Sequence, residues 1–342
     1  MRRISRMLGL LGILGCSGGV DLGQADPSQP APGKAGGLKS FASVRTGMCG
    51  LFEDGRAYCW GREGSTRANR VANLDGIAMS SAGAGQLVCV VQAGGQLACA
   101  PDTETPLKEQ LGFDDAVDVS VGGTEFCTLG RDGSIRHRFA ESCVGDGDPR
   151  PIQLPSPAIQ VRCADRGCCA ATQDGRLFCY AGNPLVACEV AFEEVPGIED
   201  AVGVSMTMEG ACVLHADGNV SCTSGRLNPV THLPDLTDFD AVGISDVVQL
   251  RSSRVATCGL TRSGMLLCWG ISQCGSLGIS EGCGSTGVTA PLAVQQDIQT
   301  RLFGMSDGYT CSLDTNDDIW CWGLSAWTGS AQGSPIPRRI EF

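Results

Sequence analysis

The chain has 342 residues, among them 48 glycines and 20 cysteines, and its formal net charge is −12 at pH 7. A chain this acidic lacks the clustered lysine and arginine that bind nucleic acid or anionic lipid surfaces, so neither is expected as a partner. The high glycine content, with only 18% charged residues, excludes a coiled coil. So many cysteines would be a liability in a reducing cytosol, and they indicate export to an oxidising compartment.

The N-terminus has the pattern of an export signal. Three arginines within the first six residues precede an apolar stretch from Met7 to Leu14, which is too short to span a bilayer as a permanent helix. The stretch ends in Ile13-Leu14-Gly15-Cys16, which resembles the bacterial lipobox. This resemblance implies a signal peptide over residues 1–15 and a lipidated Cys16 as the first mature residue. An ordinary secretory signal, in which Cys16 has no special role, is the alternative.

Residues 16–37 are rich in glycine, proline and alanine and contain few large apolar side chains. Such a segment cannot bury enough surface to fold, so we interpret it as a flexible tether. A tether behind a lipidated cysteine would lift the next domain off a membrane, with attachment through Cys16 only. We therefore expect an exported protein of the bacterial cell envelope, either an outer-membrane lipoprotein or a protein at the cell surface.

Seven segments in the rest of the chain share one frame, in which a cysteine, nine residues and a second cysteine follow one another. The frames begin at Cys49, Cys89, Cys127, Cys169, Cys212, Cys258 and Cys311. Only the third lacks its second cysteine, and His137 stands there instead. Short β-prone runs flank a turn that usually ends in glycine, which adopts the left-handed conformation of a three-residue hairpin loop. In the seventh frame this place is held by Asp317, one of the few other residue types that tolerate that conformation.

This loop length fixes the hairpin register. It pairs Leu51 with Ala57 and Cys49 with Cys59, at a non-hydrogen-bonded position where Cα atoms lie about 4.5 Å apart, which a disulfide can span. Zinc sites place roughly two to four residues between paired ligands, so no metal is expected. The spacing predicts a disulfide in each complete frame: Cys49–Cys59, Cys89–Cys99, Cys169–Cys179, Cys212–Cys222, Cys258–Cys268 and Cys311–Cys321.

The remaining cysteines lie outside these pairs. Cys274 and Cys283 bracket a glycine-rich loop and are expected to form a further disulfide. Our hypothesis for the others is that Cys127 pairs with Cys143, and that one more bond forms within a group of three, which leaves one thiol free. That group consists of Cys163, Cys168 and Cys188.

Each hairpin is preceded by a short alternating run and followed by a segment often marked by proline, so one repeat of roughly 44 residues holds four strands, as a propeller blade does. Cys-Trp-Gly follows the hairpin at Cys59, Cys268 and Cys321, and the sixth repeat continues into Cys274-Gly275-Ser276-Leu277-Gly278. These motifs resemble the regulator-of-chromosome-condensation repeat, and the paired cysteines resemble its secreted bacterial branch. The resemblance covers residues 38–342 and implies an all-β fold, a seven-bladed β-propeller of four-stranded antiparallel blades.

The sequence contains little that suggests catalysis. The founder of the family is a nucleotide exchange factor on chromatin, but nothing here matches its wedge or basic tails, so that function is not carried over. The three histidines, His137, His215 and His232, share no ligand or relay spacing. A triad assembled from distant positions stays open on sequence. We therefore expect no catalytic residue, no cofactor and no metal, and we do not expect an enzyme.

The best-supported interpretation is a monomeric binding or scaffold module that presents loops to an unknown protein or glycan. One alternative is an inhibitor of an extracellular enzyme, because a similar secreted bacterial propeller inhibits β-lactamases with the loops of one face. Another is a lyase or hydrolase, since some seven-bladed propellers are enzymes. The fold alone does not decide among them.

The loop between Cys274 and Cys283 is the candidate binding loop, because the sixth repeat is the longest. A disulfide across its base would order the loop before binding and so raise affinity. Leu277, Ile279 and Glu281 would then contact the partner. The alternative is that Leu277 is buried between blades, as part of a structural loop of the family.

Overall fold

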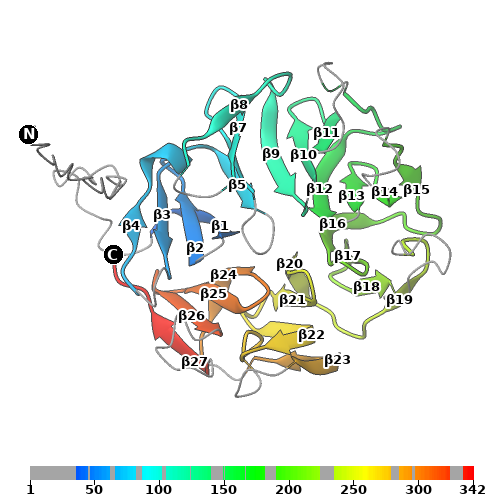
Figure 1. The fold of residues 1–342 in the computed structure, drawn as a ribbon. Helices are drawn as coiled ribbons and strands as arrows, with labels where there is room; N and C mark the ends of the chain where they lie inside the picture. The colour runs from blue at the N-terminus through cyan, green and yellow to red at the C-terminus, as the bar shows by residue number, and fades with distance from the viewer. Residues whose placement is uncertain are drawn as a thin grey trace, which may run out of the picture.

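Seven antiparallel sheets follow one another in chain order round a central axis, and each is one blade of a β-propeller (Figure 1). The computed structural model describes residues 36–44, 47–61, 66–81, 87–101, 105–123, 125–139, 149, 151–165, 167–181, 190–223, 235–278, 285–294, 297–323 and 334–342. The predicted signal peptide, Cys16 and nearly all of the predicted tether lie outside these residues. Within them, no helix has the length and apolar character needed to cross a membrane. The predicted seven-bladed propeller is confirmed.

The first four blades run from an inner to an outer strand. The first blade consists of β1 (Leu38–Val44), β2 (Gly47–Phe52), β3 (Ala57–Trp60) and β4 (Asn69–Arg70). The second consists of β5 (Ala78–Ser81), β6 (Val88–Val91), β7 (Leu97–Ala100) and β8 (Lys108–Gln110). The 3₁₀ helix η2 (Ala72–Leu74) lies between these two blades in the chain. The third blade consists of β9 (Ala116–Val121), β10 (Glu125–Gly130) and β11 (Ile135–Phe139). The fourth consists of β12 (Ala158–Ala164), β13 (Gly167–Thr172), β14 (Leu177–Ala181) and β15 (Glu193–Glu194). In the third blade, a single bridge between Ile135 and Ile152 takes the place of a described outer strand.

The last three blades repeat the pattern. The fifth consists of β16 (Ala201–Met206), β17 (Ala211–His215), β18 (Val220–Thr223) and β19 (Phe239–Ala241). The sixth consists of β20 (Val247–Ser252), β21 (Ala256–Thr261), β22 (Leu266–Gln273) and β23 (Ser285–Ala293). The seventh consists of β24 (Thr300–Met305), β25 (Tyr309–Asp314), β26 (Ile319–Gly323) and β27 (Ser334–Arg339). All strand pairs within these blades are antiparallel.

The central hairpin of each blade closes in the predicted register. In the first blade Leu51 lies opposite Ala57 and Cys49 opposite Cys59. Gly55 has a φ of 82° at the turn, and Asp317 takes the same place in the seventh blade with a φ of 65°. A left-handed residue at the end of the turn is what closes this three-residue loop.

The core is divided into seven clusters, one between each pair of neighbouring blades. Cysteines of the hairpin disulfides are members of these clusters, as Cys169 and Cys179 are between the fourth and fifth blades. The recurring tryptophans pack there too, since Trp60 and Trp322 are almost completely buried. Each blade therefore buries its apolar faces only against its two neighbours, and the ring must close to complete the core.

The ring closes without strand exchange, because each blade is built from consecutive strands. The C-terminal residues instead reach the first blade, and Figure 1 shows the C-terminus beside β4 and β27. The Ala68 amide donates to the carbonyl of Glu341 at 2.7 Å, and the Glu341 amide donates to Thr66 at 2.8 Å. Phe342 packs edge-on against Trp60. These contacts join the two ends of the propeller.

The meander gives the ring two different faces. The first strand of each blade ends at one end of the channel, where the second strand begins and the third strand ends. We call this end the loop face. The hairpin turns and the connections between blades lie at the opposite end, the turn face.

Candidate functional site

The seven innermost strands enclose a channel of about 390 Å³, which is lined by residues of every blade. Serine hydroxyls make up much of its polar lining. The charged side chains that line it are Lys39, Asp118, Arg162, Asp165, Arg251 and Arg254. Cations therefore outnumber carboxylates in the channel, although the whole chain carries a net charge of −12. A central cavity with converging polar groups is the usual place for a ligand.

One register position recurs on all seven inner strands, namely the residue paired with the first hairpin cysteine of its blade. The seven residues are Ala42, Ser80, Ser120, Arg162, Ser205, Arg251 and Gly304. All of them line the channel. Five blades place a small residue there, whereas the fourth and sixth blades place an arginine. We call this ring of residues the arginine layer.

Of the two arginines of this layer, Arg162 is paired with a carboxylate. Arg162 Nη1 donates to Asp118 Oδ2 at 2.9 Å and to the carbonyl of Val161 at 2.7 Å. Loss of solvation, with a smaller contribution from the nearby Arg162, lowers the pKa of Arg251 to about 10, and Asp118 opposes the shift. A pKa of about 10 keeps Arg251 protonated at neutral pH, so this part of the channel carries excess positive charge.

Arg254 spans the end of the channel at the loop face. Its Nε and Nη2 donate to Asp165 Oδ2 at 2.9 and 2.6 Å, from the sixth blade to the fourth. Its amide donates to Asp307 of the seventh blade at 2.8 Å, and its carbonyl accepts from the Met208 amide of the fifth at 2.9 Å. Burial raises the pKa of the Asp307 carboxyl, which the nearby Arg254 partly opposes. One residue thus fixes the turns of four blades relative to one another.

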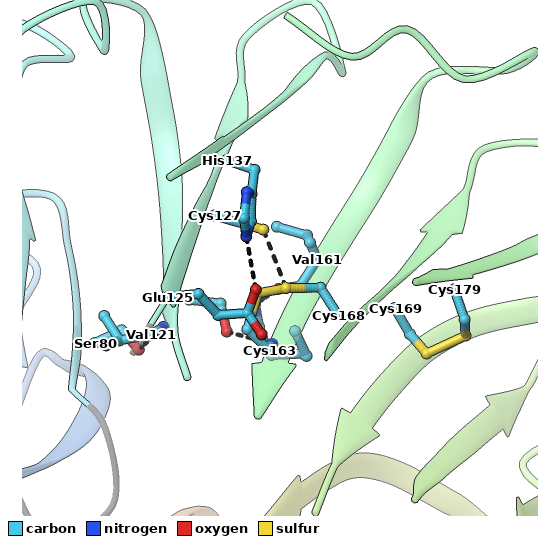
Figure 2. The surroundings of a disulfide bond; sticks show 12 residues. Ser80, Val121, Glu125, Cys127, His137, Val161, Cys163, Cys168, Cys169 and Cys179 are labelled. Atoms are coloured by element: carbon cyan, nitrogen blue, oxygen red, sulfur yellow. Dashed lines mark hydrogen bonds and ion pairs between the residues drawn. A yellow bond between two sulfur atoms is a disulfide. The ribbon is translucent and has the colours of Figure 1, made fainter. Parts of the chain in front are cut away.

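A buried cysteine group lies between the third and fourth blades (Figure 2). Cys127 is a free thiol, and its Sγ lies 3.2 Å from Cys168 Sγ, which is bonded to Cys163. Burial, with a contribution from the nearby Glu125, raises the pKa of the Cys127 thiol well above its usual value. Because the thiolate is the reactive form, this thiol is chemically inert in the folded protein.

The residue that replaces the missing cysteine of the third blade has a buried partner. His137 lies directly opposite Cys127 in the register, and its Nε2 lies 2.6 Å from Glu125 Oε2. The two side chains are only 5% and 2% exposed. Cys127, His137 and Cys168 present ligand atoms within 4.8 Å of one another. However, Cys168 is held in a disulfide and offers no thiolate, so the group does not fit a zinc site as it stands.

His215 forms a hydrogen-bonded chain that its sequence position did not reveal. Its Nδ1 lies 2.6 Å from Asp200 Oδ1, and its Nε2 lies 2.7 Å from Ser221 Oγ. This is the order of groups in a hydrolase triad. Ser221 is only 7% exposed, however, so a substrate carbonyl has no approach to its oxygen. We interpret the chain of bonds as a tie between the strands of the fifth blade.

The six hairpin disulfides predicted from the spacing are present, with Cα–Cα distances of 4.0–4.1 Å. Cys163 and Cys168 form another disulfide. It is the one bond that the sequence predicts within the group of three. The predicted Cys127–Cys143 bond is wrong, because Cys127 is free and its sulfur faces the fourth blade. The other predictions for cysteines concern residues outside those that the structure describes, namely Cys16, Cys143, Cys188 and Cys283. His232 also lies outside them.

The candidate binding loop is only partly described. Leu277 is completely buried, in the cluster between the sixth and seventh blades, so its predicted role as an exposed contact is wrong. Thr310 of the seventh blade also donates to the Ser276 carbonyl at 2.7 Å. Cys274 is disulfide-bonded, whereas Ile279 and Glu281 lie outside the described residues. The alternative of a structural loop packed between blades therefore holds for Leu277.

The Cys127 thiol should resist alkylation in the native protein. Its side chain is completely buried and its pKa is raised, so N-ethylmaleimide should modify it only after the chain unfolds in denaturant without reductant. Mass mapping of the peptide that contains Cys127, before and after unfolding, measures this. Modification of native protein as fast as of unfolded protein would contradict the buried placement.

Comparison with known proteins identifies the fold. Neither a protein-family model nor a curated protein matches the sequence. Human WBSCR16 superposes with a TM-score of 0.61 and 13% identity, over 81% of this chain and 85% of that one. The ectodomain of the receptor kinase CR4 from Physcomitrella patens gives 0.55 and 15%, over 84% and 74%.

The yeast RCC1 protein Prp20, in its structure bound to Kap60, gives a TM-score of 0.53 and 15% identity over 68% of this chain. The match covers 66% of that chain, slightly under two thirds of its length. Identities this low show the fold alone. The chain therefore has the propeller fold of the RCC1-like proteins, in agreement with the repeat motifs in its sequence.

Proposed function

We propose that this protein is an exported, lipid-anchored binding module that presents the loop face of its propeller to a protein or glycan partner. Seven described disulfides are suited to an oxidising environment outside the cytoplasm. The lipobox-like sequence that ends at Cys16 supports membrane attachment, with the tether as a spacer. The proposed form is a monomer, and the proposed origin is the secreted bacterial branch of the family.

The observation that carries this proposal is the network of Arg254 at the loop face. It joins the inner turns of the fourth to seventh blades by side-chain and backbone hydrogen bonds. The strands β14 and β18 of the fourth and fifth blades also end at this face. A surface fixed before binding loses less conformational entropy when a partner docks, which favours affinity.

Two structural neighbours support this kind of use. The yeast RCC1 protein Prp20 was solved with Kap60 bound to it, and the matching chain of CR4 from Physcomitrella patens is the ectodomain of a receptor kinase. Proteins that contain this fold therefore include one found in a protein complex and one with an ectodomain. Partner identity here depends on the loops, because the propeller itself is common to many functions.

Charge reversal on the two faces tests the proposal. Glu209, in the inner turn of the fifth blade, and Glu199, just before the same blade begins, are both exposed and lie at opposite ends of β16. With the full chain as bait in a cell-envelope extract, Glu209→Arg should weaken capture of the specific partner about tenfold or more, by loss or reversal of one charged contact. Glu199→Arg should leave capture unchanged.

Quantitative mass spectrometry of the captured proteins and glycans provides the measurement. Equal capture by both variants, or loss with Glu199→Arg only, would contradict binding through the loop face. If the captured partner is a secreted enzyme that loses activity on binding, the function is inhibition at the same face.

A further inference from the structure

We propose that the arginine layer of the central channel is a binding site for a small tetrahedral oxyanion, phosphate or sulfate, held between Arg162 and Arg251. The site is separate from the loop face, and it does not depend on the proposed function. Five of the seven blades place alanine, serine or glycine at this level, and only the fourth and sixth blades place long cationic side chains there.

The arginine layer has more positive charge than its surroundings neutralise. Asp118 is hydrogen-bonded to Arg162, and Asp165 is engaged by Arg254 at the loop face. Among the described residues, no carboxylate forms an ion pair with the Arg251 guanidinium. A partly buried guanidinium without a carboxylate is costly unless something else supplies the negative charge.

The rest of the layer supplies neutral hydrogen-bond donors. The Ser80 hydroxyl accepts from the Val121 amide at 3.1 Å, and the Ser120 hydroxyl accepts from the Cys163 amide at 2.9 Å. A hydroxyl that accepts a bond from a backbone amide keeps its own proton to donate. The oxygens of an oxyanion would therefore meet guanidinium and hydroxyl donors on the same level of the channel.

The chemistry of these groups selects the ligand. Guanidinium presents a planar fork of N–H donors that matches the oxygens of phosphate or sulfate, and such charge-assisted bonds are stronger than neutral ones. The excess of cations disfavours a metal ion. The anion would also offset the unfavourable proximity of Arg162 to Arg251, which contributes to the lowered pKa of Arg251. A cavity of about 390 Å³ leaves room for the anion and several waters.

The experiment compares three forms of the full chain: the wild type, Arg251→Gln and Arg262→Gln. Arg262 belongs to the same blade but is 77% exposed on the surface, so its variant controls for loss of one positive charge. Isothermal titration with inorganic phosphate, sulfate and glycerol phosphate is run at constant ionic strength. The wild type and Arg262→Gln should bind one phosphate per chain, and Arg251→Gln should lose about tenfold or more in association constant.

Thermal unfolding separates binding from a merely structural role. Phosphate should raise the melting temperature of the wild type, because a ligand that binds only the folded state stabilises it. The rise should be absent in Arg251→Gln. Without phosphate, Arg251→Gln should melt at or above the wild-type temperature, since removal of one of two neighbouring guanidiniums relieves their repulsion.

Three results would overturn the proposal. They are an absence of phosphate and sulfate binding by the wild type, equal binding by Arg251→Gln, and a lower melting temperature of that variant in phosphate-free buffer with binding unchanged. If Arg251→Gln does not fold, Arg251→Lys keeps the charge without the planar fork and should bind phosphate more weakly than the wild type. Tighter binding of glycerol phosphate than of inorganic phosphate would assign the site to the terminal group of a larger ligand.

Discussion

Replacement of Glu125 by leucine should lower the free energy of unfolding by about 3 kcal/mol, because breaking a buried pair by removing one partner is strongly destabilising. Glu125 is 1% exposed, and its Oε2 lies 2.6 Å from His137 Nε2 (Figure 2). The substitution would remove that contact from a side chain that is itself nearly buried. Urea unfolding, followed by fluorescence of the tryptophans, measures the change.

The double variant Glu125→Leu/His137→Leu is the control. Replacing both members of a buried pair with apolar residues of similar volume is often neutral, whereas breaking the pair is not. The double variant should therefore recover much of the stability that Glu125→Leu loses. If the loss of unfolding free energy in the double variant equals the sum of the losses in the two single variants, the two side chains are not energetically coupled and the prediction fails.

The hairpins could be predicted from sequence because local chemistry determines them. A glycine such as Gly55 fixes the turn type, the turn fixes the register, and the register brings Cys49 opposite Cys59. The same reasoning holds in the seventh blade, where Asp317 adopts the left-handed conformation. Repetition of this unit seven times then determines the ring, since each blade can bury its faces only against another blade.

The state of Cys127 could not be predicted in the same way. Its nearest sulfur, Cys168, lies 41 residues later in the chain and belongs to the next blade. Hairpin geometry gives no information on contacts between blades, so it cannot exclude the predicted bond between Cys127 and Cys143. The Cys163–Cys168 bond, by contrast, has a local signal, since the two residues lie opposite each other across the turn from β12 to β13.

The arginine layer has a signal that is readable only with the inner-strand register in hand. Arg162 and Arg251 each stand seven residues before the first cysteine of their hairpin, Cys169 and Cys258. The structure shows that this offset places both side chains on one level of the channel. Arg254 offers no such signal, because it reaches Asp165 across an intervening blade, 89 residues away.

The third blade should accept the disulfide that its sequence lacks. In the double variant Glu125→Ala/His137→Cys, the introduced thiol would stand opposite Cys127, at the register position where six other hairpins carry a disulfide. Alanine is a suitable replacement for Glu125, because Ala256 occupies the corresponding position in the sixth blade. The new bond should raise the free energy of unfolding by about 2–3 kcal/mol on the chain-entropy estimate for a short loop.

Counting thiols decides whether the bond forms. After unfolding without reductant, the double variant should show one labelled thiol fewer than the wild type, since Cys127 would no longer be free. If the bond does not form, the variant instead shows one thiol more. The buried contact of Cys127 with Cys168 at 3.2 Å makes this a demanding test, because the introduced cysteine must compete with a neighbouring sulfur already in place. A new disulfide between Cys127 and the introduced residue in the non-reduced peptide map would show that the register alone determines where these blades can be cross-linked.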